Sequence, residues 1–246
     1  MFSWETRSYM LACFLAFGKG IPYIYLQATV NTMQPVLEEF ITVNLEKHHN
    51  ITISKAAMVW LWSALLSIPS VVSVPTTFML SSRLSDNLGR RKAYLIAGPG
   101  MLLVCSVTFA ASHLLESVPT FCLALLLMFI AYSIGSPINN TYLVETASPN
   151  VRSAVVTLCI ALRGLGDVVG SVMSHKSVLG HPDGWWRVYA VATLPTGIAL
   201  VLGTLFLPES PKWWLLIRGD SVKAAKALRR FNVPEGRIDA ILEETW

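Results

Sequence analysis

The chain has 246 residues, of which 53% are hydrophobic and only 14% are charged, and its formal net charge is +4. With a mean hydropathy of +0.53, it is too apolar to cover its surface with polar groups as a soluble domain of this size does. The small excess of cations is typical of the loops of a membrane protein, and we find no nucleic-acid-binding signature.

Six apolar stretches alternate with polar segments along the chain. Each is roughly twenty residues long, the length that a helix needs to cross a hydrocarbon core of about 30 Å. Lipid offers backbone amides no partners, and the stretches lack a period-2 alternation, so we predict helices rather than a closed barrel. The expected fold class is all-α, a polytopic membrane protein with six transmembrane helices near residues 9–30, 57–80, 93–112, 119–141, 153–174 and 188–207.

The polar loop between the second and third stretches predicts the orientation in the membrane. Residues 82–92 contain four Arg or Lys residues, and short loops rich in these cations stay on the cytoplasmic side. Residues 31–56 are then outside, and an even number of spans leaves both termini in the cytoplasm. The outer segment contains Asn50-Ile51-Thr52, so Asn50 is a candidate N-glycosylation site.

The character of the sequence changes after residue 207. Residues 221–231 place Ala and Leu three and four positions apart with cations between them, which predicts an amphipathic helix outside the membrane. We therefore divide the chain into an N-terminal six-helix transmembrane bundle, residues 1–207, and the start of a cytosolic helical linker, residues 208–246.

The sequence contains no pattern that is typical of an enzyme. The cysteines fall inside predicted spans without metal-ligand or Cys-x-x-Cys spacing, and neither a nucleophile elbow nor a phosphate loop is present. We expect no catalytic residue, no metal and no cofactor, and we do not expect the chain to be an enzyme.

Four charged motifs follow one another in the polar segments. They are Asp86-Asn87-Leu88-Gly89-Arg90-Arg91, Glu145 followed by Arg152, Trp186-Arg187, and Pro208-Glu209-Ser210-Pro211-Lys212. In this order they resemble the sugar-porter branch of the major facilitator superfamily, and within it the facilitative glucose transporter family. The resemblance covers nearly the whole chain but only the first half of that family's architecture.

The resemblance implies transport of a hexose-like or other small polar solute across a membrane by alternating access. The chain would be the N-terminal half of a facilitative uniporter, and its partners would be the solute, the lipid bilayer, and a C-terminal half or a second copy. The plasma membrane is the location that the family implies. Two alternatives stay open: a non-transporting half-transporter that acts as a membrane interaction or regulatory protein, and a proton-coupled solute symporter.

A cytoplasmic gate is the role that the resemblance implies for the charged loops. Carboxylates at Asp86 and Glu145 can form charge-assisted hydrogen bonds with arginines, and Gly89 permits a tight turn. In the similar family such pairs hold the inner side closed, and the Glu209 position pairs with their cations. The alternative is topogenic charge and surface ion pairs worth about 0–1 kcal/mol each. The candidate gate residues are Asp86, Gly89, Arg90, Arg91, Glu145, Arg152 and Glu209.

Polar residues inside the spans are the candidates for binding the solute. Gln27, Asn31 and Gln34 are neutral donors and acceptors suited to a sugar, and Asn31 matches a position that touches sugar in the similar family. The alternative is that these amides face interfacial water at the end of a helix.

Three charges are predicted near the middle of the membrane, at Lys19, Arg163 and Asp167. Each costs a few kcal/mol unless it is paired or hydrated. Arg163 and Asp167 are four residues apart on one helix and can neutralise each other. The alternative is that one of the three lines a water-filled cavity and binds substrate or a coupling proton.

Overall fold

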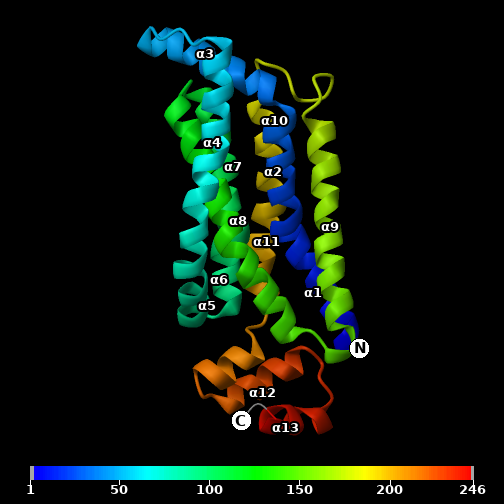
Figure 1. The fold of residues 1–246 in the computed structure, drawn as a ribbon. Helices are drawn as coiled ribbons and strands as arrows, with labels where there is room; N and C mark the ends of the chain where they lie inside the picture. The colour runs from blue at the N-terminus through cyan, green and yellow to red at the C-terminus, as the bar shows by residue number, and fades with distance from the viewer. Residues whose placement is uncertain (1–2, 245–246) are drawn as a thin grey trace.

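The computed structural model describes residues 3–244, and within that range the chain is helical with no β-strand. Long helices form a bundle, and the short helices α12 (Ser221–Arg230) and α13 (Glu235–Glu244) lie across one end of it (Figure 1). We call that end the base. The opposite end carries α3 (Gln34–His49) and is called the α3 end.

Within residues 3–244, six helical runs are long and apolar enough to cross a membrane, and they coincide with the six predicted stretches. Each begins one to five residues before its predicted boundary, because capping and turn residues continue a helix beyond its apolar centre. The predicted all-α class with six membrane-spanning helices is confirmed. The runs are Trp4–Thr32, Lys55–Leu88, Arg90–Leu114, Val118–Thr146, Pro149–Met173 and Trp186–Phe206.

The first three runs are each interrupted by a π-helical turn. A proline, Pro22, Pro75 or Pro99, lies in or close to each turn, and its missing amide proton breaks the regular hydrogen-bond ladder there. The segments are α1 (Trp4–Leu15), η1 (Ala16–Gly20) and α2 (Ile21–Thr32); α4 (Lys55–Thr76), η2 (Thr77–Ser81) and α5 (Ser82–Leu88); and α6 (Arg90–Leu95), η3 (Ile96–Gly100) and α7 (Met101–Leu114).

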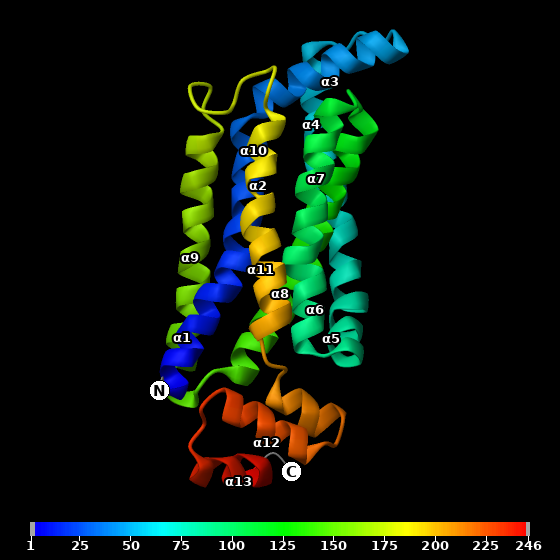
Figure 2. The ribbon, with the colours of Figure 1, turned by 180° about the vertical axis from the view of Figure 1, so that it is seen from behind.

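The remaining runs are more regular. The fourth is the single helix α8 (Val118–Thr146), and the fifth is α9 (Arg152–Met173) after the short 3-10 turn η4 (Pro149–Val151). The sixth consists of α10 (Trp186–Val191) and α11 (Thr193–Phe206), which run between α9 and α7 in Figure 2. A last π-helical turn, η5 (Trp213–Ile217), then leads to α12.

Two glycines of α9 allow it to pack closely against α2. A Cβ atom at Gly166 would overlap the carbonyl oxygen of Ile21, and one at Gly170 would lie 2.8 Å from the carbonyl oxygen of Tyr25. These glycines are four residues apart and therefore lie on the same face of α9. Small residues at this spacing are a common way for membrane helices to bring their backbones together.

Two clusters of buried side chains among residues 3–244 hold the bundle together, one toward each end. The cluster at the α3 end contains Trp185, and it includes Phe109 stacked on Tyr189 with ring centroids 4.4 Å apart. The cluster at the base includes Tyr94 and Tyr142, which are both fully buried. Leu228 of α12 belongs to the same cluster. The buried side chains at the base therefore connect the bundle to the short helices that cover it.

Apolar side chains are most exposed along two of the runs. Only 17% of the most apolar window of Lys55–Leu88 and 22% of that of Pro149–Met173 is buried within the chain. Phe78 is 79% exposed and Val168 is 63% exposed. Surfaces of this kind are suited to contact with lipid or with another apolar helix rather than with water.

Candidate functional site

A tight turn at Gly89 joins the second and third runs at the base. Gly89 has a φ of 93°, which side-chain-bearing residues rarely adopt. A Cβ atom at this position would also overlap a carboxylate oxygen of Glu209. Glycine is therefore required at this position for two reasons: the backbone conformation, and the close approach of the segment after the sixth run.

Arg90, directly after this turn, connects three polar side chains. Its Nη1 donates hydrogen bonds to Oγ of Ser85 at 2.9 Å and to Oδ1 of Asp86 at 2.5 Å. Its Nε lies 3.2 Å from both carboxylate oxygens of Glu145 on α8. The side chains of Arg90 and Glu145 are only 12% and 15% exposed, so water screens their interaction weakly. Arg90 thus fastens the end of α8 to the turn between α5 and α6.

The segment after the sixth run completes the polar cluster through Glu209 and Ser210. The hydroxyl of Ser210 donates to Oε2 of Glu145 at 2.5 Å. Oε1 of Glu209 accepts hydrogen bonds from the backbone amides of Arg91, at 2.9 Å, and Ser210, at 3.0 Å. Glu209 therefore caps the first amides of α6, where a negative charge is favourable. Burial raises the pKa of its carboxyl group, and the hydrogen bonds from backbone amides partly oppose that rise.

Aromatic and cationic side chains cover this cluster from the side of η5. The indole nitrogen of Trp213 donates to the backbone carbonyl of Asp86 at 2.9 Å. Arg218 donates to the carbonyl of Asn87 at 3.0 Å, and its guanidinium lies 5.0 Å from the centre of the Trp213 ring. The base is therefore closed over the turn at Gly89 by contacts from residues more than a hundred positions later in the chain.

The structure brings together most of the predicted gate residues, but not in every predicted pair. Arg152 makes no ion pair within residues 3–244, and its buried Nε has no hydrogen-bond partner there. The guanidinium of Arg91 donates to the backbone carbonyl of Thr204 rather than to a carboxylate. Glu209 contacts backbone amides instead of the cationic side chains that the resemblance implies. We name the set that does meet, Ser85, Asp86, Arg90, Glu145, Glu209 and Ser210, the base cluster.

The sequence did not indicate every residue of this site. It missed Ser85 and Ser210, which belong to the base cluster, and Trp213, which contacts the backbone of Asp86. Ser210 and Trp213 lie within or just after the Pro-Glu-Ser-Pro motif, so their position gave a usable signal. Ser85 precedes Asp86 directly and gave none, because a serine in a polar loop has many possible roles.

The predicted substrate residues lie toward the α3 end of the bundle, in α2 and at the start of α3. Gln27 is half-buried and Asn31 is exposed, and both are on the same face of α2. Gln34, at the start of α3, donates from Nε2 to Oε1 of Glu38 at 2.7 Å. These amides are therefore near one another along the helix, while the bond to Glu38 occupies one donor of Gln34.

The charges within the spans do not form the predicted pair. Arg163 and Asp167 share α9, yet no ion pair between them occurs within residues 3–244. Asp167 is exposed, whereas Nε of Arg163 is buried without a hydrogen-bond partner in the described part of the chain. Lys19, in η1, is 2% exposed, and its Nζ lies 5.3 Å from the centre of the Tyr132 ring. Local pairing along α9 therefore does not explain these charges.

Asn50 ends α3 with a φ of 52° and is exposed at the α3 end. Its left-handed conformation is one that asparagine adopts more readily than most residues. The sequon is therefore accessible and lies at the end of the bundle opposite the base cluster.

Comparisons with known proteins show the family to which the chain belongs. The profile of the sugar (and other) transporter family matches residues 11–245. The facilitated glucose transporter member 7 of solute carrier family 2 from Mus musculus is 27% identical over 229 residues, which cover 93% of this chain and 44% of that protein. Member 5 from Ovis aries is 28% identical over 235 residues, covering 93% of this chain and 46% of that protein. The chain thus spans about half the length of these curated relatives.

Solved structures show the same fold. The proton:xylose symporter XylE bound to 6-bromo-6-deoxy-D-glucose superposes with a TM-score of 0.78 at 18% identity, covering 98% of this chain and 53% of that chain. An inward-open conformation of XylE from E. coli gives a TM-score of 0.68, also at 18% identity, over 97% and 55% of the two chains. The six runs therefore form one half of a major facilitator fold, and the relatives are transporters rather than enzymes. The chain belongs to the sugar (and other) transporter family and is an integral, multi-pass membrane protein.

Proposed function

We propose that this chain is the N-terminal half of a transporter that carries a sugar or a similar small polar solute by alternating access. Membership of the family and the half-length match to its relatives support this proposal. In such an architecture the substrate is held near the membrane midplane, between two six-helix halves. The single observation that carries the mechanism is the base cluster, in which Arg90 fastens the second and third runs to the fourth.

The base cluster acts in this proposal as a latch on the cytoplasmic side. Asp86, Arg90 and Glu145 come from separate helical runs, and their hydrogen bonds keep the ends of those runs together. Glu209 and Ser210 add the segment after the sixth run to the same network. Opening of the base then requires these charge-assisted hydrogen bonds to break. The cluster therefore has two states in this proposal, bonded when the base is closed and separated when it is open.

Uptake by the complete protein tests the function. The protein is reconstituted in liposomes, and uptake of radiolabelled hexoses and pentoses is measured with the mirror-image sugars as controls. We expect saturable, stereospecific uptake of at least one sugar. Uptake of every sugar at the rate of protein-free liposomes would contradict transport of a sugar and would favour the regulatory alternative.

Variants of the base cluster test the latch. Loss of the Arg90 contacts in Arg90→Ala removes buried pairs worth a few kcal/mol, so we expect uptake to fall by about tenfold or more. Arg229→Gln is the control, because Arg229 is an exposed arginine on α12 that pairs with Glu235 and not with a residue of the base cluster. Equal uptake by Arg90→Ala and Arg229→Gln would show that the cluster is not a gate.

Gln27, Asn31 and Gln34 are proposed to supply this half's contacts to the solute. Their amides offer the neutral donors and acceptors that a sugar requires, and Gln27 and Asn31 are on one face of α2. The exposed apolar faces of α4 and α9 are consistent with contact between this half and a partner, either a C-terminal half or a second copy. We expect Asn31→Leu to raise the KM for uptake, with Glu46→Gln on the exposed side of α3 as a control.

Proton-coupled symport is a second candidate, and Asp167 favours it. An exposed carboxylate on a membrane-spanning helix, without an ion pair to Arg163, is a suitable carrier for a coupling proton. Symport predicts accumulation of sugar against its gradient when the outside is acidic, and loss of that accumulation in Asp167→Asn. Uptake that only equilibrates the sugar, with or without a pH gradient, would establish uniport.

The sides of the membrane follow from the same proposal. The base, with residues 208–246 as a helical linker and residues 1–207 as the bundle, faces the cytoplasm, and the α3 end with a glycosylated Asn50 faces outward. Cations concentrated near the turn at Gly89 support this orientation. We propose the plasma membrane as the location.

A further inference from the structure

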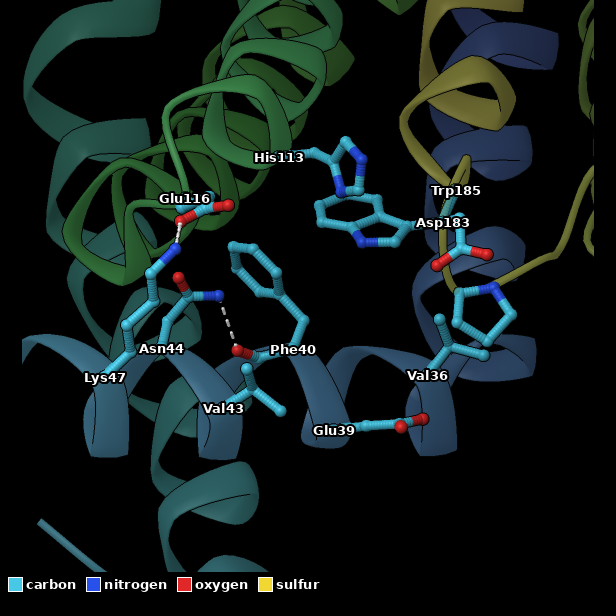
Figure 3. A pocket seen from close by; sticks show the side chains of 11 residues that line it. Val36, Glu39, Phe40, Val43, Asn44, Lys47, His113, Glu116, Asp183 and Trp185 are labelled. Atoms are coloured by element: carbon cyan, nitrogen blue, oxygen red, sulfur yellow. Dashed lines mark hydrogen bonds and ion pairs between the residues drawn. The ribbon is translucent and has the colours of Figure 1, made fainter.

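A cavity of about 390 Å³ lies at the α3 end, far from the base cluster. Figure 3 shows that α3, the turn between α7 and α8, and the segment before α10 surround it. These three segments follow the first, third and fifth helical runs, so a ligand in this cavity would contact parts of the chain that are far apart in the sequence. Nothing in the proposed transport cycle requires such a site.

Aromatic rings form one wall of the cavity. Phe40 and His113 each meet the ring of Trp185 edge-on, with centroids 5.1 Å apart in both pairs. Phe40 comes from α3, His113 from α7 and Trp185 from the segment before α10. Aromatic rings grouped in this way attract cations and also pack against short apolar chains.

Asn44 contributes a polar atom that has no partner in the described part of the chain. The residue is 6% exposed, and its Nδ2 donates to the carbonyl of Phe40 at 2.8 Å, which fixes the orientation of the amide. Its Oδ1 is buried and accepts no hydrogen bond within residues 3–244. Nδ1 of His113, on the same cavity, is also buried without a partner there. A buried acceptor is costly to leave unsatisfied, so the cavity is suited to a ligand that donates hydrogen bonds.

The charges that line the cavity are mainly negative. Glu116 is paired with Lys47, and that pairing lowers the pKa of Glu116. Glu39 and Asp183 also line the cavity and form no ion pair within residues 3–244. The cavity therefore offers two uncompensated carboxylates. The described residues contain no group of three or more metal-ligating side chains, so a bare metal ion does not suit it.

We infer that this cavity binds a small organic ammonium ion, a primary amine with a short apolar chain. The ammonium group donates a hydrogen bond to Oδ1 of Asn44, and its charge is attracted by Glu39 and Asp183. The apolar chain packs against Phe40 and Trp185. Such a ligand would tie α3 to the third and sixth runs.

Binding of n-butylammonium to the protein in lipid nanodiscs tests this inference, with 1-butanol as the neutral probe of matched size. Calorimetry and saturation-transfer NMR measure the affinity at low and at high salt. We expect saturable binding of the ammonium that weakens with salt, and binding of the alcohol that is at least about tenfold weaker. Equal affinity for the two probes would overturn the inference, because it would make the cavity merely apolar.

Variants locate the binding. Asn44→Leu removes the unpaired acceptor at similar volume, and we expect an affinity about tenfold lower, as for loss of a hydrogen bond to a charged donor. Glu39→Gln and Asp183→Asn should each lower affinity by roughly threefold and reduce the dependence on salt. The matched control is Glu46→Gln, an exposed carboxylate on α3 that does not line the cavity.

Unchanged affinity in all three cavity variants would overturn the assignment to this site. Helical circular dichroism of each variant separates loss of binding from loss of folding, and Glu39→Gln and Asp183→Asn change exposed side chains that the fold does not need. Sugar uptake by the protein is a separate readout, so failure of this inference leaves the proposed transport function untouched.

Discussion

Arg90 contacts side chains from two helical runs, so its loss should affect the stability of the whole base. In Arg90→Ala the carboxylate of Glu145 stays buried and keeps only the hydroxyl of Ser210. Removing one partner of a buried pair typically costs about 3 kcal/mol. We expect a clear fall in the unfolding temperature in detergent, and a smaller one for Arg90→Lys, which keeps the charge but loses the planar fork.

The control for this experiment is Arg83→Ala. Arg83 is an exposed arginine on α5 and makes no hydrogen bond or ion pair within residues 3–244. Its removal should change stability by less than about 0.5 kcal/mol. If Arg90→Ala and Arg83→Ala unfold at the same temperature, the base cluster contributes nothing to stability.

Glu209 should give the protein a measurable dependence of stability on pH. Its pKa is raised in the folded state, chiefly by burial, so the folded state favours the protonated carboxyl group. The contribution of Glu209 to stability is therefore fully present below the ordinary pKa of a glutamate. It is lost as the pH rises through the raised value.

Glu209→Gln removes this titration while it keeps an oxygen that can accept from the amides of Arg91 and Ser210. The difference in unfolding free energy between wild type and variant should therefore shift in favour of the variant as the pH rises from acid to neutral. Asp220→Asn is the control, and its effect on stability should change with pH in the opposite direction. Lys223 lowers the pKa of Asp220, so that contribution is lost as the pH falls. A pH-independent difference for Glu209→Gln would contradict the raised pKa.

At the level of single residues, the sequence predicted which charged residues come together better than which atoms they contact. Asp86, Arg90 and Glu145 meet as the motif order implies, because each loop returns to the same end of the bundle. Arg152 and Glu209 find different surroundings from those expected. Their contacts depend on which backbone amides and carbonyls the fold leaves free nearby, and a sequence motif does not carry that information.

At the level of elements, hydropathy alone located all six runs, whereas their interruptions and contacts needed the structure. An apolar stretch of sufficient length has no alternative to a helix in lipid, which makes the prediction secure. The π-helical turns depend on how neighbouring helices accommodate Pro22, Pro75 and Pro99. Gly166 and Gly170 were visible in the sequence, but their importance appears only once α2 is seen against that face.

The close packing of Gly166 and Gly170 against α2 leads to a prediction about stability. A Cβ atom at Gly166 would overlap the backbone of α2, so Gly166→Ala should push α2 and α9 apart and destabilise the protein by about 1–3 kcal/mol. At Gly164, on the same helix, a Cβ atom would meet no other described residue within 4 Å. Gly164→Ala should therefore be neutral or stabilising by up to about 1 kcal/mol, because alanine favours the helix.

Unfolding free energies of the two variants in the same detergent provide the measurement. Because both variants make the same substitution in the same helix, differences in helix propensity cancel between them. Equal effects of Gly166→Ala and Gly164→Ala would mean that α2 and α9 do not pack through this face.

At the scale of the whole molecule, the bundle has two chemically different ends. Figure 1 shows the short helices α12 and α13 at the base and α3 at the opposite end. The base also carries the Arg90 contacts, and the α3 end carries Asn50 and the acidic cavity. An orientation with the base in the cytoplasm predicts a glycan at Asn50. Treatment with a glycosidase should therefore shift the protein to lower mass, and Asn50→Gln should remove the shift.

Single-cysteine variants test the same orientation without relying on glycosylation. With the native cysteines replaced, Ile51→Cys places an exposed thiol at the α3 end, and Lys226→Cys places one on α12 at the base. A membrane-impermeant maleimide should label the first in intact cells and the second only after the membrane is permeabilised. Labelling of Lys226→Cys in intact cells would show that the base faces outward, opposite to the proposed orientation. The latch would then close the outer side of the transporter, and the ammonium cavity would open to the cytoplasm.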